Sequence, residues 1–375
     1  MQNRRDFLRQ AAGASAGVFC AACGLRRARA QGAGAQGAGA RSADKRREVT
    51  VGGRRIKTID VHCHCVVPDA LDLVKGTAME RTLRAQLTGS LGFPVGAERI
   101  AHMDSDGIDV QAMSINAYWY GADRDLARRI VDMQNEKLAK MCEAYPDRVT
   151  AYATVALQFP EIAAEQLERG VKELGLCGAA IGGSVEGEEL SSRKFDPFWA
   201  KAEALQALVF IHPQTAPEST GIAKRIQGSG ALGNVIGNPL ETTLALSHLI
   251  FEGTLDRFPN LKICAAHGGG YLPSYAARMD HGCAVFPAQC KGPTLKKQPS
   301  EYLKQLYFDS IVFTSEGLRH LVAECGASQV VIGTDYAVPW VEDPVDHVLN
   351  TPTLSDADRI AILGGTAAKL LRLAS

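Results

Sequence analysis

The chain has 375 residues, of which 46% are hydrophobic and 22% are charged, with 41 basic and 41 acidic side chains. This is an ordinary composition for a folded protein, and it excludes both a disordered chain and a small domain that depends on disulfides. The formal net charge of zero gives no overall attraction to nucleic acid or anionic lipid.

The charge is unevenly distributed along the chain. Residues 1–47 contain ten of the basic and two of the acidic side chains, so the rest of the chain carries a net charge of −8. A domain of this sign is poorly suited to a polyanion. We therefore expect no nucleic-acid partner.

The first thirty residues are typical of an export signal. Residues 3–9, Asn-Arg-Arg-Asp-Phe-Leu-Arg, resemble the twin-arginine motif, and a Gly/Ala-rich apolar run from Ala11 to Leu25 follows. The run is too short and too weakly apolar for a membrane span. Ala28-Arg29-Ala30 has the small-x-small form of a cleavage site. We expect residues 1–30 to direct the protein through the twin-arginine export machinery to the periplasm or out of the cell. The alternative is a lipoprotein anchor at Cys23.

A linker and one folded domain are expected to follow. Residues 31–40 repeat Gln-Gly-Ala-Gly-Ala twice, which is typical of a flexible segment. The sequence therefore predicts a Gly/Ala-rich linker over residues 31–47 and a folded domain over residues 48–375. Eight cysteines follow Ala30 without a zinc-type Cys-x-x-Cys pair, and their disulfide pairing is not readable from their spacing.

Eight short apolar segments alternate with helical patterns in this domain. Some are continuously apolar, such as residues 208–211, which is typical of parallel strands covered by helices. From Asp123 to Tyr145 apolar residues recur at helical spacing, with Asp123 as a candidate N-cap. Eight alternations over roughly 320 residues favour an α/β domain of the (β/α)8 TIM-barrel class over an open doubly wound sheet. The expected strands lie within residues 56–64, 108–116, 149–157, 176–182, 207–212, 261–267, 306–313 and 329–335.

Histidines in the first expected strand are placed to chelate a metal ion. His62 and His64 are two residues apart, so their side chains share one face, while Cys63 and Cys65 point to the other. Two imidazoles on one face can hold a cation together. The two thiols, on the opposite face, read as small buried apolar residues rather than as ligands.

Three further polar residues end apolar strands: His212 the fifth, His267 the sixth and Asp335 the eighth. In a barrel, the functional groups gather at the carboxyl ends of the strands. Separate buried titratable groups would each need a partner of their own. One shared metal ion would satisfy the whole set, so we expect a metal site at this end.

The complete pattern resembles a known superfamily. His-x-His, then a strand-end histidine, then His-Gly-Gly-Gly, then Gly-Thr-Asp are similar to the amidohydrolase superfamily in its amidohydrolase 2 branch. That branch includes the α-amino-β-carboxymuconate-ε-semialdehyde decarboxylases and related metal-dependent decarboxylases. Matching stretches at residues 99–181, 239–270 and 299–335 extend the resemblance over nearly the whole mature chain.

The resemblance implies a ligand set with one metal ion. Two-metal members carry a carbamylated lysine at the end of the fourth strand, whereas residues 178–184 contain no lysine. Carried over by position, the metal ligands would be His62, His64, His212 and Asp335. His267 would act as the acid/base beside the metal. Zinc is the expected ion, although nitrogen and oxygen ligands also admit manganese or iron.

Substrate contacts are expected from three side chains. Trp119, in Tyr118-Trp119-Tyr120 after the second strand, could form a stacking wall, or this segment could be ordinary aromatic packing under a loop. Arg278 lies eleven residues after His267, as does an arginine that binds substrate carboxylate across a dimer in the semialdehyde decarboxylase family. This match implies a homodimer. The family's second arginine has no counterpart at the same position, and Arg84 or Arg81 is nearest.

With the export signal, the resemblance implies an exported, metal-dependent decarboxylase, a carbon–carbon lyase acting on a small unsaturated or aromatic carboxylic acid. The alternative enzyme is a metal-dependent hydrolase or hydratase acting on a carboxylate-bearing ester, lactone or enol, because the same ligands serve both chemistries. A non-catalytic alternative is a periplasmic binding protein that uses the metal as a structural clamp.

Overall fold

The computed structural model describes residues 46–214, 222–290 and 295–373. The chain divides into a unit Met1–Lys45 and a second unit Arg46–Ser375, and all the described residues belong to the second. The predicted signal peptide, with Cys23, and residues 31–45 of the predicted linker therefore lie outside the described residues.

In the described residues, eight parallel strands carry the fold, and each lies within one of the eight segments predicted from the sequence. They form a three-stranded sheet in the order β3-β4-β5 and a five-stranded sheet in the order β12-β11-β10-β9-β6. Neighbouring strands in both sheets are parallel. The strands are β3 (Ile59–His64), β4 (Val110–Ser114), β5 (Val149–Ala151), β6 (Gly178–Ile181), β9 (Leu208–Ile211), β10 (Lys262–Ala265), β11 (Leu306–Asp309) and β12 (Val330–Val331).

Backbone hydrogen bonds also cross both seams between the two sheets. At one seam Ala153 forms an isolated parallel bridge with Ala179, and its N–H donates to the carbonyl of Gly178 over 2.8 Å. At the other, Cys63 forms a parallel bridge with Tyr336. The ends of β5 and β6, and of β3 and the segment after β12, are therefore neighbours.

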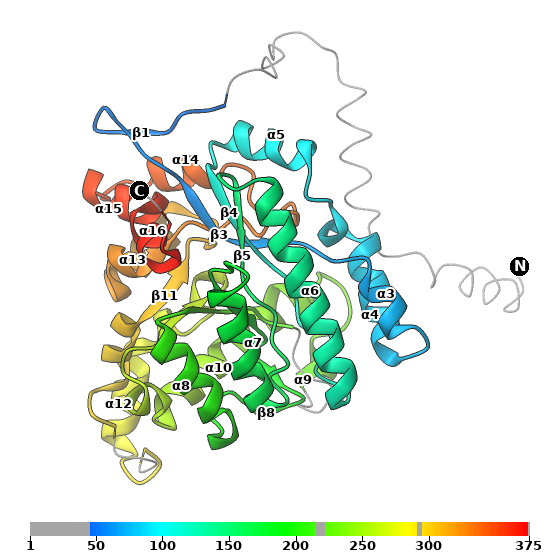
Figure 1. Ribbon diagram of the computed structural model, residues 1–375. Helices are drawn as coiled ribbons and strands as arrows, with labels where there is room; N and C mark the ends of the chain where they lie inside the picture. Colours follow the sequence, from blue (N-terminus) through cyan, green and yellow to red (C-terminus); the bar gives the residue numbers. More distant parts are fainter. Residues whose placement is uncertain (1–45, 215–221, 291–294, 374–375) are drawn as a thin grey trace, which may run out of the picture. The chain divides into compact units, whose positions relative to one another are not determined.

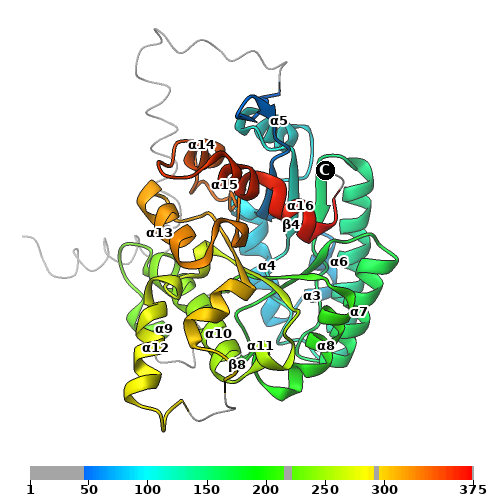
Figure 2. The same cartoon turned by 90° about the vertical axis from the view of Figure 1, so that its left-hand side faces the viewer.

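Helices connect consecutive parallel strands. Figure 1 shows α6, α7 and α8 side by side along one flank of the strands, and Figure 2 shows α10 and α12 on the other. The helices are α3 (Ala70–Val74), α4 (Ala78–Thr88), α5 (Ala97–Asp106), α6 (Arg124–Ala144), α7 (Pro160–Lys172), α8 (Asp196–Leu205), α9 (Ile222–Arg225), α10 (Asn238–Phe251), α11 (Thr254–Arg257), α12 (Ala276–Val285), α13 (Ser315–Cys325), α14 (Pro344–Leu349), α15 (Asp356–Ile360) and α16 (Thr366–Leu371). Within the described part of the chain, none is both long and apolar enough to cross a membrane.

The start of α6 confirms the predicted N-cap. The carboxylate of Asp123 accepts a hydrogen bond from the N–H of Leu126 over 2.9 Å, which satisfies one of the unpaired donors at the first turn.

Shorter elements, which the sequence does not predict, complete the connections. Two antiparallel hairpins have strands of only two residues, too short to show any periodicity: β1 (Thr50–Val51) with β2 (Arg54–Arg55), and β7 (Ser184–Val185) with β8 (Glu188–Glu189). The remaining short helices are η1 (Ser90–Gly92), η2 (Arg193–Phe195), η4 (Gly233–Gly237), η5 (His267–Gly269), η6 (Pro273–Tyr275), η7 (Pro299–Gln305), η8 (Ala327–Gln329) and η9 (Ala361–Gly365).

An inner hydrophobic cluster lies between the strands. It contains alternate strand residues, among them Ile59, Leu208 and Phe210, which are fully buried. Helix α16 adds Leu370 to the same cluster. Since Ile59 and Leu208 are the first residues of their strands, α16 covers the amino-terminal ends of the strands, opposite the ends that carry the predicted site.

An outer cluster packs the other strand faces against the helices. Cys63 and Cys65 belong to it, as their alternation with the histidines predicts. Burial raises the pKa of Cys63 well above its ordinary value and that of Cys65 to about 11, so both thiols stay protonated near neutral pH. The pairing of β3 with β4 shifts between Asp60 and Cys63, an irregularity that the sequence does not predict.

One disulfide joins Cys283, near the end of α12, to Cys290, with their Cα atoms 5.4 Å apart. The other six cysteines in the described residues are free and at least partly buried. The short separation of seven residues makes this pairing local, since it closes a loop at the end of one helix.

Candidate metal centre

Contacts to the Nδ1 atoms of the two histidines of β3 orient both rings so that their Nε2 atoms face one point. The Nδ1 atom of His62 lies 2.6 Å from Oδ2 of Asp309, and Nδ1 of His64 lies 3.1 Å from the hydroxyl of Ser114. Their Nε2 atoms are 3.2 Å apart. Both rings are buried, so each imidazole presents one nitrogen to a common space.

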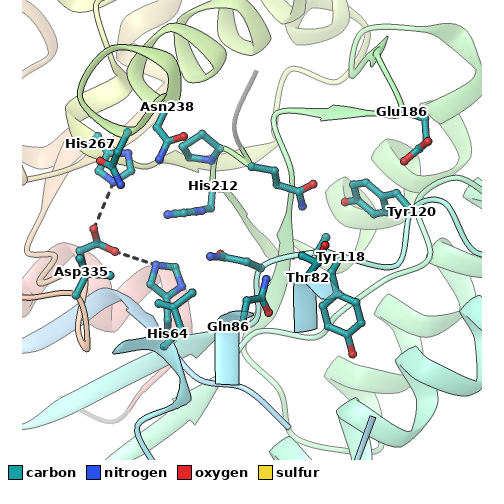
Figure 3. A pocket seen from close by; sticks show the side chains of 17 residues that line it. His64, Thr82, Gln86, Tyr118, Tyr120, Glu186, His212, Asn238, His267 and Asp335 are labelled. Atoms are coloured by element: carbon teal, nitrogen blue, oxygen red, sulfur yellow. Dashed lines mark hydrogen bonds and ion pairs between the residues drawn. The ribbon is translucent and has the colours of Figure 1, made fainter. Parts of the chain in front are cut away.

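Asp335 supplies the carboxylate at this point. Its Oδ1 lies 2.9 Å from Nε2 of His64, and its Oδ2 lies 3.7 Å from Nε2 of His267 (Figure 3). The same Oδ1 lies 3.2 Å from Nε2 of His62. The N–H of Asp335 donates to the carbonyl of His62 over 2.8 Å, which holds the two chain segments together.

His212 and His267 complete the group. The ring of His212 is centred 4.5 Å from that of His64 and 5.0 Å from that of His62. One ligand atom from each of His62, His212, His267 and Asp335 lies within 4.8 Å of the others, and His64 contacts two members of this set. The structure thus brings together all five predicted residues.

Burial and neighbouring charges shift the pKa values of His62 and Asp335 in opposite directions. Burial alone would lower the pKa of His62, but the carboxylates of Asp335 and Asp309 outweigh it and raise the pKa to about 10. Burial lowers the pKa of His64, and burial with the neighbouring histidines holds the pKa of His212 well below its ordinary value. Burial would raise the pKa of Asp335, yet the histidines hold it well below its usual range.

Asp309 contacts this group of side chains and is a residue that we do not predict from the sequence. It ends β11 and is fully buried. Besides contacting His62, its carboxylate accepts hydrogen bonds from the N–H groups of His267 and Gly268 over 2.8 and 2.9 Å. A signal was present, because an apolar strand that ends in aspartate is also the pattern that marks Asp335.

The glycines after His267 are needed for this geometry. His267 has φ 56°, and Gly268, Gly269 and Gly270 all have positive φ. A Cβ on Gly270 would lie 2.1 Å from the carbonyl oxygen of Pro239, and one on Gly269 would lie 2.6 Å from the ring of Phe308. The turn that projects His267 is therefore open only to glycine at these positions.

A second buried network holds the backbone of the histidine strand. Asp60 accepts hydrogen bonds from the N–H of His62 over 3.0 Å and from the Thr334 hydroxyl over 2.7 Å, while burial raises its pKa to about 6. The buried guanidinium of Arg99 donates to the carbonyl of His64 and to the amide oxygen of Gln111, each over 2.8 Å. These hydrogen bonds hold the backbone of β3 in place beside the metal centre.

The donor set fits a divalent cation. Several imidazoles and one carboxylate form the nitrogen and oxygen set that zinc, manganese and iron accept. The buried Nδ1 of His212 has no hydrogen-bond partner within the protein, which is costly for a polar atom unless a ligand binds it. Asp309 behind His62 is the kind of carboxylate that orients a metal-binding imidazole.

A cavity of about 420 Å³ opens at this group. His64, His212, His267 and Asp335 line one end, and Figure 3 shows Glu186 and Tyr120 at the other. A second cavity of about 250 Å³ shares His267 and Asp335 with the first. The larger volume is in the usual range for a small-molecule site.

The three predicted substrate contacts do not line this cavity. Trp119 is 0% exposed and donates its indole N–H to the carbonyl of Val155, so it is a core residue, and its neighbours Tyr118 and Tyr120 line the cavity instead. This corrects the predicted stacking role of Trp119, because packing in the core and the hydrogen bond to Val155 turn this loop side chain away from the cavity.

The two arginines also point elsewhere. The Arg84 side chain is 59% exposed and pairs with Glu80 one turn earlier in α4, while Thr82 and Gln86 of the same helix line the cavity. Arg81 is exposed as well. Arg278 is exposed on α12 and lines neither this cavity nor the smaller one beside it. Within one chain, neither Arg84 nor Arg278 lines the cavity at the metal centre.

The fold and the donor set are those of a metal-dependent enzyme with its site at the carboxyl ends of parallel strands. The profile of the amidohydrolase family matches residues 59–373. The match spans most of the chain, and the chain belongs to the amidohydrolase family.

The most similar proteins include decarboxylases. The 2-amino-3-carboxymuconate-6-semialdehyde decarboxylase of Dictyostelium discoideum is 32% identical over 278 residues, which are 73% of this chain and 76% of that protein. A similar solved structure is that of dihydroxybenzoic acid decarboxylase from Polaromonas sp. JS666, with bound manganese and the inhibitor 2-nitroresorcinol. Its sequence is 28% identical, and the two structures align with a TM-score of 0.74 over 85% of this chain and 97% of that chain.

A third similar protein is 5-carboxyvanillate decarboxylase from Novosphingobium aromaticivorans, solved with manganese and 4-hydroxy-3-methoxy-5-nitrobenzoic acid. It has 25% identity and a TM-score of 0.74 over 85% of this chain and 96% of its own. These comparisons confirm the family predicted from the sequence, and they favour the decarboxylase over the hydrolase.

Proposed function

We propose that this protein is a metal-dependent carboxy-lyase that removes carbon dioxide from a small aromatic or unsaturated carboxylic acid. The observation that carries the proposal is the convergence of four histidines and Asp335 on one end of a cavity large enough for a single-ring acid. The names of the similar proteins support the same reaction class.

The metal would be held by His62, His64, His212 and Asp335. When bound, a divalent ion supplies positive charge that polarises a carboxylate or a neighbouring hydroxyl group. We propose zinc from the sequence, while the two similar structures hold manganese. Metal analysis of the purified protein tests this choice, and manganese or iron as the active metal would reject zinc.

His267 would hold the proton and donate it to the substrate. In the proposed reaction the bond between the substrate carbon and its carboxylate breaks, carbon dioxide leaves, and the electron pair stays on that carbon, which then takes a proton. His267 lies on the wall of both cavities, with Nε2 3.7 Å from Oδ2 of Asp335. An imidazole can hold and give this proton near neutral pH.

Product analysis tests the reaction class. The metal-loaded protein should release carbon dioxide from hydroxybenzoates and leave esters and lactones intact. Hydrolysis without release of carbon dioxide would establish the hydrolase instead.

We further propose that the eight parallel strands form a closed (β/α)8 barrel. The bridges at both seams and the interior cluster support closure. A crystal structure in which either seam is open would contradict it.

A homodimer in which Arg278 reaches a neighbouring copy is also proposed. Its exposed position on α12 is consistent with a contact outside its own chain. Sedimentation tests the assembly, and a monomer with full activity would contradict it.

Export to the periplasm by the twin-arginine route completes the proposal. The local disulfide between Cys283 and Cys290 supports it, because such bonds persist in oxidising compartments. Replacing Arg4 and Arg5 by lysine should retain the protein in the cytoplasm, and unchanged export would reject the route.

A further inference from the structure

We infer that the second cavity beside the metal centre is a subsite for an apolar substituent of the substrate, an alkyl chain such as propyl. We call this cavity, of about 250 Å³, the side cavity. The inference rests on the proposed function, because it places the reacting carboxylate at the metal centre. It adds the part of the acid that lies away from the reacting carbon.

The side cavity and the main cavity meet at the metal centre. Asn234, His267 and Asp335 line both of them. A molecule whose carboxylate lies beside His267 can therefore extend into either cavity. The chemistry of the two walls then decides which part of the molecule enters which cavity.

The side cavity has an apolar wall. Polar side chains such as Gln86, Asn116 and Glu186 line the main cavity. Among the described residues that line the side cavity, His267 and Asp335 are the only acidic, basic or histidine side chains. A polar substituent would lose water there without gaining a partner, whereas an alkyl chain gains from burial. Six apolar residues, which we call the apolar wall, line the side cavity: Val235, Pro239, Ile311, Val312, Phe313 and Trp340.

Part of the apolar wall is exposed to solvent. Eight large hydrophobic side chains are exposed in the described residues, and three of them, Val235, Phe313 and Trp340, line the side cavity. Ile311 of the same wall is buried. Exposed apolar side chains that gather at one cavity are typical of a binding site. An alkyl chain in the side cavity would cover them.

Phe313 has a backbone conformation that a bulky residue seldom adopts. Its φ is 60°, in the left-handed region, where glycine or asparagine is far more common. Its ring centre lies 6.1 Å from that of Trp340. Because the Phe313 side chain is largely exposed, packing in the core does not explain a phenylalanine here. Contact between the ring and a bound substituent does, since strained residues are often found where a protein contacts its ligand.

Calorimetric titration of the metal-loaded full chain tests the subsite without turnover. The probes are 2-nitrophenol and its four isomers with propyl on the ring, in which a nitro group replaces the reacting carboxylate. Each buried methylene group is worth about fourfold in affinity, so at least one propyl isomer should bind roughly tenfold more tightly than 2-nitrophenol. The same isomer with 2-hydroxyethyl in place of propyl should gain little. No gain from any propyl isomer, an equal gain from hydroxyethyl, or no binding by any probe would overturn the inference.

Two neighbouring residues provide a matched pair of variants. Val235→Trp should reduce the propyl advantage by about fivefold or more, because the indole fills the side cavity and the chain can bury less surface. Ile236→Trp is the control, since Ile236 is also exposed but does not line the side cavity. If Val235→Trp keeps the advantage, or if Ile236→Trp loses it equally, the side cavity is not the subsite.

Phe313→Asn separates binding from folding. Asparagine tolerates the left-handed conformation better than phenylalanine, so Tm should stay the same or rise. The propyl advantage should fall by about threefold or more, because the ring no longer covers the chain. A lower Tm with an unchanged advantage would show that the ring serves the fold and would contradict the inference.

A second copy of the chain is the competing occupant of the apolar wall. Sedimentation of the parent and of Val235→Asp distinguishes the two, because a charge on the wall would dissociate a dimer formed there. Such dissociation would overturn the inference, whereas unchanged sedimentation supports it.

The outcomes also separate this inference from the proposed function. Release of carbon dioxide from hydroxybenzoates without any propyl advantage would refute the subsite alone. A propyl advantage without release of carbon dioxide from any acid would refute the reaction alone.

Discussion

The two ends of the strands differ in almost every physical property. At the amino-terminal end, Ile59, Leu208 and Leu370 pack into an apolar cluster that α16 covers. At the carboxyl end, only a few residues further along the strands, His62 and Asp335 are buried and have strongly shifted pKa values.

The difference shows which end of the strands stabilises the fold and which end carries the metal centre. Apolar burial favours folding, whereas buried histidines and carboxylates cost free energy unless they are paired or bind a ligand. The histidine end is therefore maintained for function at some cost to stability, and the apolar end offsets that cost. The following predictions test this division.

The largest expected effect is on turnover. His267→Asn should lower kcat by roughly 10²–10⁴-fold, the usual contribution of a positioned acid/base, because the proton donor is lost while the four proposed metal ligands remain. Metal content, measured by elemental analysis, should stay unchanged. His320→Asn, at a half-exposed histidine of α13, is the control. Full activity of His267→Asn would reject the assigned role.

A smaller effect is expected from the carboxylate behind the metal site. Asp309→Asn should weaken metal binding by roughly 10–100-fold, as is usual for a residue that orients a ligand, because it removes the charge that orients His62. Competition with a fluorescent chelator measures the affinity. The exposed Asp72→Asn serves as the control. If both variants bind metal as the parent does, Asp309 has no such role.

The apolar end should respond in the opposite way. Leu370→Ala should lower the free energy of unfolding by about 2–5 kcal/mol through loss of buried surface and creation of a cavity. Urea denaturation measures this change. Metal affinity of the folded protein should stay within a factor of two of the parent, and a large loss of affinity would show that the two ends are coupled.

The smallest effect is expected at a residue near the site but outside its cavity. Arg84→Ala should change KM by less than about twofold, because the side chain is exposed and pairs with Glu80 in a surface ion pair worth little. Steady-state kinetics measure it. A large rise in KM would show that Arg84 contacts the substrate and would contradict this expectation.

The sequence predicts the strand-end residues well because each stands out locally. His62, His64, His212, His267 and Asp335 interrupt or end apolar runs, and the parallel arrangement of the strands makes those ends meet. The eight strands are predicted for the same reason. Local patterns therefore suffice for most of the metal site.

The parts that the sequence leaves open depend on side chains far apart in the chain. Gln86, Asn116, Gln214 and Asn238 lie in three different connections after strands, the last two in the same connection, and meet only in the folded protein. Trp119 shows the converse, because a residue adjacent to two cavity residues faces the core. Burial and direction of a loop side chain are set by tertiary packing, which no local period encodes.

The central claim is metal-dependent decarboxylation, and one measurement tests it most directly. Hydroxybenzoates labelled with ¹³C in the carboxyl group, including 2,6-dihydroxybenzoate, should be incubated with the metal-loaded protein while labelled carbon dioxide is followed by mass spectrometry. We expect labelled carbon dioxide in equal amount to the decarboxylated phenol, abolished by a chelator and restored by the divalent metal. Absence of labelled carbon dioxide from every acid, with metal-dependent cleavage of an ester or lactone, would contradict the account.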